Sequence, residues 1–372
     1  MKKRLQKLGL LSIAEKVENQ TRINEEEALQ LFECGDLQAL GYLANQINVR
    51  KNKNRATYIF NRYINYSNLC ILSCQFCSFY RRKNQPGAFE FSVEEVVADA
   101  KASYDQGACE VHIVGGLHPK LPFSYYLEMV QGIKAACPGI FVKAFTAVEI
   151  RHFADRIAKL SLQETLQTLK DHGLDSLTGG GAEIFDPTIR DQICRGKETA
   201  DEWLEVHRLW HTLGGKSTCT MLYGHLESLA QRVDHLRRLR SLQDETHGFT
   251  GFIPFAFEPE NNKLSELRRT TAYDDLRTLA ISRIYLDNFD HITAYWVSLG
   301  LPLAQIALSY GVDDLHGTIE VERIFHMAGA QTPQQQTRQR LEKAIRETGR
   351  TPIARNTWYE PLEKQPLEVL ST

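Results

Sequence analysis

The sequence predicts an α/β protein built around a TIM-type (β/α) barrel, with helical extensions at both ends. Between residues 55 and 316, short apolar runs alternate with helical patterns roughly six to eight times, which indicates a parallel sheet covered by helices. Glycines and polar residues directly follow several predicted strands, and in barrels the C-terminal ends of the strands carry the chemistry. The length of 372 residues is large for one domain, yet α/β barrels often reach it undivided.

Composition and charge narrow the class of protein. Hydrophobic residues make up 42% of the chain and charged residues 24%, which is typical of a globular protein. The net charge of −2 gives no electrostatic support for a nucleic-acid or membrane partner. The basic N-terminus is interrupted by Glu15, and no apolar stretch is long enough to span a bilayer. We therefore expect a cytoplasmic protein that acts on a small molecule.

The first elements along the chain can be placed from their capping residues. Residues 1–54 are predicted to form a helical extension, in which Asn24 and an acidic first turn begin one helix. The barrel is predicted over residues 55–316, with its first strand at 57–66. Ser92 and Glu95 form a capping box at the start of the next helix.

The later elements continue the alternation. Capping boxes at 161–164 and 199–202 begin two further helices, and apolar spacing predicts others near 124–136, 229–244 and 274–286. From residue 317 the chain is polar, and it is predicted to form a C-terminal helical extension over 317–372. Strands are predicted at 110–114, 140–146, 175–178, 216–224, 251–257 and 291–296, with 304–311 as a candidate eighth.

Three cysteines follow the first predicted strand with C-x3-C-x2-C spacing: Cys70, Cys74 and Cys77. Clustered thiolates favour an iron–sulfur cluster, zinc or copper. A structural zinc site usually needs a second pair of ligands, and none lies nearby in the sequence. Three cysteines on a four-iron cluster would leave one iron open to another ligand. A zinc-binding scaffold without redox chemistry stays as the alternative. The other five cysteines are isolated and are expected to be buried hydrophobic residues.

The triplet, with Phe76 before its last cysteine, resembles the cluster loop of the radical S-adenosylmethionine (SAM) superfamily. This resemblance implies a [4Fe-4S] cluster on the three cysteines, SAM at the open iron, and an electron donor such as flavodoxin or ferredoxin. Gly115 and Gly116 resemble the glycine pair that contacts the SAM amino group. The usual acidic third residue is replaced here by Leu117.

Further SAM contacts are implied by the same resemblance. The run from Thr220 resembles the fifth-strand motif that supports adenine through its backbone, which places Leu222, Tyr223 and Gly224 at the cofactor, although Thr220 replaces the first expected glycine. Glu183 follows a triple glycine, and Glu149 follows the third predicted strand. Either carboxylate is a candidate to accept hydrogen bonds from the ribose.

Substrate-binding candidates come from basic and aromatic side chains. His118 and His225 lie near predicted strand ends and are candidates for catalysis or substrate binding. Cationic side chains are candidates to pair with substrate carboxylates, Arg offering a bidentate fork; they are Arg81, Arg82, Lys143 and Arg283. Apolar strand ends suit a site that excludes water, and the candidates are Phe145, Tyr223, Phe255 and Tyr295.

A narrower resemblance extends from about Tyr58 to Gly329. The segments HIVGGLHPKLPFSYY, LDSLTGGGAEIFD, TMLYGH and FIPFAF are similar to those of the aminofutalosine synthase family of menaquinone biosynthesis. In that family the 5′-deoxyadenosyl radical adds to 3-[(1-carboxyvinyl)oxy]benzoate. Aryl migration and decarboxylation then give 6-amino-6-deoxyfutalosine, so SAM is a co-substrate. The cyclase of dehypoxanthine futalosine and a deazaflavin-synthase-like enzyme are the alternatives of the same fold.

Overall fold

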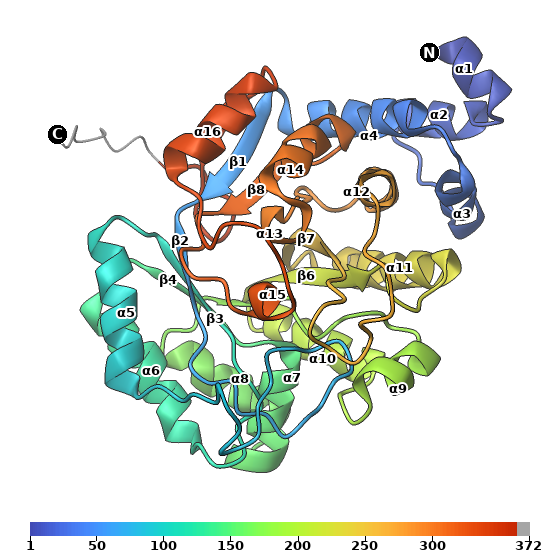
Figure 1. The fold of residues 1–372 in the computed structure, drawn as a ribbon. Coiled ribbons are helices and arrows are strands. Elements are labelled where there is room, and N and C mark those ends of the chain that lie inside the picture. Colours follow the sequence, from blue (N-terminus) through green and yellow to red (C-terminus); the bar gives the residue numbers. More distant parts are fainter. Residues whose placement is uncertain (363–372) are drawn as a thin grey trace, which may run out of the picture.

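The computed structural model describes residues 1–362 and contains two parallel sheets (Figure 1). One has six strands in the order β2-β3-β4-β5-β6-β7, and the other has three in the order β8-β1-β9. Every ladder between these strands is parallel. The strands are β1 (Arg55–Ile59), β2 (Asn61–Ile64), β3 (Glu110–Ile113), β4 (Phe141–Ala144), β5 (Ser176–Leu177), β6 (Lys216–Tyr223), β7 (Phe249–Ala256), β8 (Asp314–Gly317) and β9 (Thr351–Ala354).

Backbone hydrogen bonds join the two sheets into a curled barrel. β1 and β2 are successive parts of one stretch of chain, so the second sheet continues the first. On the other side, Thr293 N donates to Phe252 O of β7, and Ala294 N donates to Asp314 O of β8. Thr57 N then connects β1 to Asp313 O. The predicted parallel barrel is confirmed, although only isolated bridges, not a full strand, link β7 to β8.

Helices surround the strands (Figure 1). The predicted capping boxes at Ser92, Ser161 and Thr199 form, and so does the predicted cap at Asn24, which is itself a capping box with Glu27. Within residues 1–362, no helix combines the length and apolar character needed to cross a membrane. The α-helices are α1 (Lys2–Lys7), α2 (Leu11–Glu18), α3 (Glu25–Glu33), α4 (Leu37–Asn52), α5 (Val93–Asp105), α6 (Phe123–Ala136), α7 (Ala147–His152), α8 (Leu162–Asp171), α9 (Pro187–Cys194), α10 (Ala200–Thr212), α11 (Leu229–Thr246), α12 (Ala272–Tyr285), α13 (Trp296–Leu299), α14 (Leu301–Ala307), α15 (Ile324–Met327) and α16 (Arg338–Glu347).

The prediction of an eighth strand at residues 304–311 was wrong. Residues 304–311 belong to α14 and a following 3-10 turn, whereas the strand is β8. β8 has the sequence Asp-Leu-His-Gly, and its Asp314 and His316 side chains are buried. Sequence patterning missed this strand because its polar residues lie inside the protein, where an apolar alternation is normally expected.

The position of Glu149 also differs from the prediction. Ala147, Val148 and Glu149 do not end the third strand; they form the first turn of α7. The Thr146 side chain accepts a hydrogen bond from Glu149 N, and the Glu149 carboxylate returns to Thr146 N, which completes a capping box. Glu149 is thus the third helical residue.

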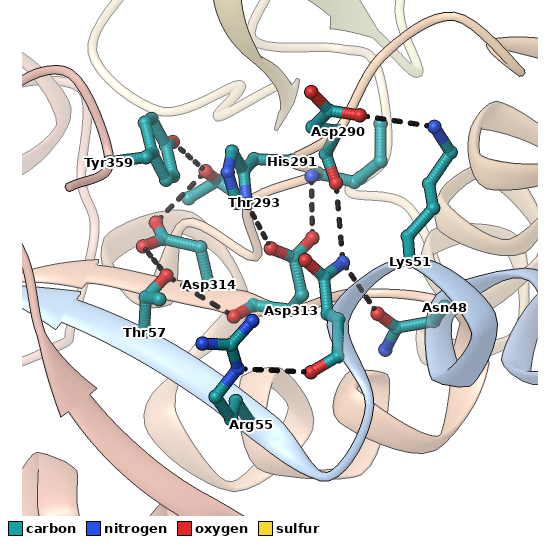
Figure 2. A network of polar contacts seen from close by, with 12 residues as sticks. Asn48, Lys51, Arg55, Thr57, Asp290, His291, Thr293, Asp313, Asp314 and Tyr359 are labelled. Atoms are coloured by element: carbon teal, nitrogen blue, oxygen red, sulfur yellow. Dashed lines mark hydrogen bonds and ion pairs between the residues drawn. The ribbon is translucent and has the colours of Figure 1, made fainter. Parts of the chain in front are cut away.

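The C-terminal part is not a purely helical extension, and its last described residues close the base of the barrel. It contains α15 and α16 but also β9, which pairs with β1. Arg355 beyond β9 donates to both oxygens of buried Asp314 at 2.7 and 3.1 Å. The Tyr359 hydroxyl bonds Thr293 at 3.0 Å, and the Tyr359 ring stacks on His291 with centroids 4.1 Å apart (Figure 2). The predicted domain boundary at residue 316 stays a prediction. The presence of β9 contradicts the prediction that the segment after this boundary is wholly helical.

Candidate active site

A cavity of about 280 Å³ extends from the C-terminal ends of the strands into the barrel. Strand alternation decides what lines it, because successive side chains point to opposite faces. On β6, Thr218, Thr220 and Leu222 line the cavity, whereas the intervening residues face the surrounding helices. Predicted site residues that line this cavity are Cys70, Cys74, Phe76, Cys77, Gly115, Gly116, Glu149, Glu183 and Leu222, together with Phe255 and Tyr295.

The loop that carries the three cysteines is irregular, but backbone contacts fix it. Cys70 N donates to Arg81 O (3.1 Å), Gln75 N donates to Ile193 O (2.7 Å), and Leu117 N donates to Cys70 Sγ (3.4 Å). Burial raises the pKa of the Cys74 thiol to about 12 and also raises that of Cys77. Thiolates that are partly withdrawn from water, as these are, are stabilised by nearby positive charge, which iron or another metal provides.

The three thiols are soft donors that could hold a metal centre. Within residues 1–362, no three His, Cys, Asp or Glu side chains are close enough to hold a single ion. A four-iron cluster makes a different demand, because each cysteine binds its own iron. The donor set, three soft sulfur ligands on one cavity wall, is that of an iron–sulfur cluster.

The glycine pair allows the end of β3 to pass close beside the cysteine loop. A Cβ on Gly116 would lie 2.4 Å from Leu69 O and 3.0 Å from Cys70 Cβ. A Cβ on Gly115 would lie 2.4 Å from the ring of Tyr66. Only glycine fits at either position without moving these neighbours. The pair therefore forms a cradle in which backbone groups face the cavity beside the thiols.

Glu149 lines the cavity, but hydrogen bonds already hold both of its oxygens. Oε1 accepts from the Tyr66 hydroxyl (2.8 Å) and from Gly115 N (3.0 Å), and Oε2 accepts from Thr146 N (2.8 Å). Burial raises the pKa of Glu149 to about 7, while these donors act in the opposite direction. The contacts tie α7 to the glycine cradle, and the predicted contact between Glu149 and the ribose stays a prediction.

Glu183 has a cationic partner that the sequence did not single out. It adopts a left-handed backbone conformation (φ 42°) and pairs with Lys197. Burial acts to raise the pKa of Glu183, but Lys197, together with Arg190 and His225, outweighs it and the net shift is downward. Lys197 also lies over the Phe76 ring, 5.5 Å from its centroid. Among the cavity-lining residues of the described chain, Lys197 is the one Lys or Arg.

Of the fifth-strand motif, Thr220 and Leu222 line the cavity. The Tyr223 side chain points outward and donates to Asp275 at 2.9 Å. Gly224 follows with a φ of 89° and lies outside the cavity lining. His225 is held locally, with Nε2 3.0 Å from Leu222 O and Nδ1 accepting from Leu226 N. Its placement gives no support to a catalytic role.

The other predicted substrate-binding residues also lie outside the cavity lining. His118 Nδ1 accepts from Leu121 N, and Nε2 lies 2.5 Å from a Glu90 oxygen. Arg81 donates to the carbonyls of Ser78 and Pro86 within the cysteine loop. Arg283 is completely buried, and its guanidinium pairs with Asp313 at 2.5 Å. These three residues have structural partners in place, and Arg283 belongs to the base of the barrel.

An aromatic wall also lines the cavity. Phe255 and Tyr295 contact edge to face, with centroids 4.9 Å apart, and Phe325 lies 5.4 Å from each. Phe325 comes from the C-terminal part, which the sequence did not connect with the site. The expected Phe145 instead packs in the core against Tyr126 and Phe153.

Comparisons with known proteins agree with this site. A family model described as "Radical SAM superfamily" matches residues 64–239, and one described as "CofH/MqnC C-terminal region" matches 246–368. A methylornithine synthase structure shares the fold with a TM-score of 0.73 at 16% identity, covering 91% of this chain and 97% of that one. An FeFe-hydrogenase maturase from Carboxydothermus hydrogenoformans also has a TM-score of 0.73, at 18% identity, covering 96% and 82%.

Sequence relatives resolve the family further. An aminodeoxyfutalosine synthase of Thermus thermophilus is 47% identical, covering 94% of this chain and 95% of that protein. One from Streptomyces coelicolor is 41% identical, covering 95% and 94%. A cyclic dehypoxanthine futalosine synthase of Streptomyces coelicolor is 36% identical, covering 96% and 90%. With its three cavity-facing cysteines and these full-length relatives, the chain belongs to the aminodeoxyfutalosine synthase family of radical SAM enzymes.

Proposed function

We propose that this enzyme joins the 5′-deoxyadenosyl group of SAM to 3-[(1-carboxyvinyl)oxy]benzoate and forms 6-amino-6-deoxyfutalosine for menaquinone biosynthesis. The observation that carries the proposal is one continuous cavity, which the three cysteines and the aromatic wall both line. The reaction joins two substrates, so both must reach the same space. The 47% identity to an aminodeoxyfutalosine synthase supports this reaction over the cyclase, at 36%.

The cofactors follow from the residues around the cradle. Cys70, Cys74 and Cys77 would hold a [4Fe-4S] cluster, which when bound supplies the electron that cleaves SAM. The backbone at Gly115 and Gly116 would receive the SAM amino group, and a flavodoxin or ferredoxin would serve as electron donor. Lys197 offers the cavity's buried positive charge to a carboxylate, and its partner Glu183 is within reach of the same ligand.

The protein's own contribution is positioning and exclusion of water. A radical that adds to a double bond needs no strong acid or base, but it must meet its target before it meets solvent or another side chain. Phe255, Tyr295 and Phe325 provide a flat apolar surface for an aromatic ring. The acidic residues of the cavity already have partners; Glu322, for example, accepts from Phe325 N (3.0 Å) and bonds His326 Nδ1 (2.8 Å).

An anaerobic assay tests the reaction directly. The reconstituted protein is incubated with SAM, dithionite and the enolpyruvyl-oxybenzoate, and the products are identified by mass spectrometry. We expect a product that contains the whole 5′-deoxyadenosyl group plus the substrate minus carbon dioxide. Free 5′-deoxyadenosine with unchanged benzoate would refute the synthase assignment, and consumption of dehypoxanthine futalosine would identify the cyclase instead.

A further inference from the structure

A buried lysine whose amino group has no hydrogen-bond or ion-pair partner in the described chain lies inside the barrel; burial lowers its pKa, and the Glu110 carboxylate acts in the opposite direction. Lys143 on β4 is only 4% exposed, and no hydrogen bond or ion pair of its ammonium group is found within residues 1–362. The Glu110 carboxylate acts on it at longer range, but that group accepts from Asn61 Nδ2 (3.0 Å) and Thr357 Oγ1 (2.8 Å). Buried charges are normally paired because isolation from water is costly. Lys143 is therefore free to meet an anion that enters the barrel.

Strand register brings this lysine beside the cavity floor. Tyr63 on β2 pairs directly with His112 on β3, and His112 pairs directly with Lys143 on β4. Neighbouring strands lie about 4.8 Å apart, so the three side chains form one row on the inner face. Tyr63 and His112 line the cavity, and their rings stack with centroids 4.3 Å apart. The row thus leads from the cavity directly to Lys143.

His112 is the polar group of this row that faces the cavity. Its Nδ1 has no hydrogen-bond partner in the described part of the chain, whereas the Tyr63 hydroxyl is 3.1 Å from His316 Nε2. Burial lowers the pKa of His112 well below its ordinary value, and Lys143 adds to this shift. The neutral ring still carries one N–H donor. An anion at the floor would accept that hydrogen bond and lie next to the lysine charge.

We propose that His112 and Lys143 form an anion subsite at the cavity floor that holds the ring carboxylate of the benzoate substrate. This inference rests on the proposed function. In that reaction the carboxylate on the reacting carbon is lost, and the ring carboxylate is kept. The double bond must face the cysteine loop, so the ring carboxylate points inward. The ring itself then lies beside the aromatic wall.

Binding of two matched probes tests the subsite without turnover. 3-Methoxybenzoate and the neutral 3-methoxybenzamide are titrated calorimetrically into the anaerobic, unreduced holoenzyme with SAM bound. Because a charge-assisted hydrogen bond contributes more than a neutral one, we expect the native protein to prefer the carboxylate by about tenfold or more. Lys143→Met, which keeps an unbranched side chain one atom shorter and removes the charge, is expected to lose this preference through weaker binding of the carboxylate alone.

Two further variants complete the test. Lys120→Met removes an exposed lysine and should keep the native preference. His112→Phe retains a ring against Tyr63 but removes both nitrogens, so it should also lose the preference, and it tests the subsite even if Lys143→Met does not fold. Equal binding of both probes to the native protein, or a native preference in folded Lys143→Met, overturns the subsite. Absence of the expected product in the mass-spectrometric assay would refute the proposed reaction, whereas the preference for the carboxylate probe is measured independently of turnover.

Discussion

Replacing Gly116 by alanine is expected to displace the cysteine loop and abolish most of the activity. The added Cβ would lie 2.4 Å from Leu69 O, about 1 Å closer than an ordinary contact, and 3.0 Å from Cys70 Cβ. Both atoms belong to backbone or to a cluster ligand, so neither can rotate away. Overpacking of this kind costs about 1–3 kcal/mol, and a displacement of about 1 Å at a reacting centre can reduce the rate by about a hundredfold.

The assay has two readouts and a matched control. Iron content and the thiolate-to-iron absorbance report whether the cluster is held, and product formation reports turnover. Gly35→Ala is the control, because a Cβ there meets nothing within 4 Å and no left-handed conformation is required. We expect Gly35→Ala to keep the native cluster content and turnover, and the turnover of Gly116→Ala to be lower by about a hundredfold. Full cluster content with full activity in Gly116→Ala would refute the reasoning that this glycine makes room for the loop.

Three further predictions concern the cluster and the barrel base. Alanine at any one of the three loop cysteines should abolish turnover, whereas Cys109→Ser should retain it; a fully active loop variant would exclude the cluster assignment. Arg355→Met leaves the Asp314 carboxylate buried without its ion-pair partner. We expect the unfolding free energy, measured by denaturation, to fall by about 3–5 kcal/mol. A loss below about 1 kcal/mol would contradict a structural role for this ion pair. The pKa of buried Glu110 is lowered to about 2 from 4.5, with burial opposing the shift and Lys143 the largest favourable cause. The ionised Glu110 carboxylate therefore stabilises the folded protein above pH 4.5, and this stabilisation is lost as the pH falls toward 2. Glu110→Gln should reduce the acid-induced loss of unfolding free energy by about 3 kcal/mol. An unchanged dependence of stability on pH in this variant would disprove the prediction.

The cysteine loop and the helix starts were predictable because the signals that specify them are local. The spacing of Cys70, Cys74 and Cys77 fits within eight residues, and each capping box fits within four. Strands with one apolar face were equally predictable, because the alternation of apolar and polar residues is visible in consecutive positions of the sequence. The β8 strand escaped because Asp314 and His316 face a polar barrel interior, which reverses the usual alternation.

Residues of the cavity were harder to predict, because their roles depend on partners far away in the chain. Tyr223 and Leu222 are adjacent, yet only Leu222 lines the cavity, and the difference comes from which face of β6 turns inward. Arg283 resembled a substrate-binding arginine until Asp313 was found beside it. Lys197, in a short turn after α9, carried no sequence signal, yet it lines the cavity with only 10% of its side chain exposed.

By itself the sequence determined the parallel α/β barrel, the thiol loop at its first strand end and the family of the enzyme. The tertiary structure alone decided which charges have partners. Glu149 accepts a hydrogen bond from the glycine cradle, and Arg355 pairs with Asp314 at the base of the barrel. Lys143 lies beside His112 without a hydrogen-bond or ion-pair partner in the described chain. The physical reason is that hydrogen bonding and desolvation depend on contacts between distant segments, whereas helix caps, strand alternation and cysteine spacing depend on neighbours in the chain.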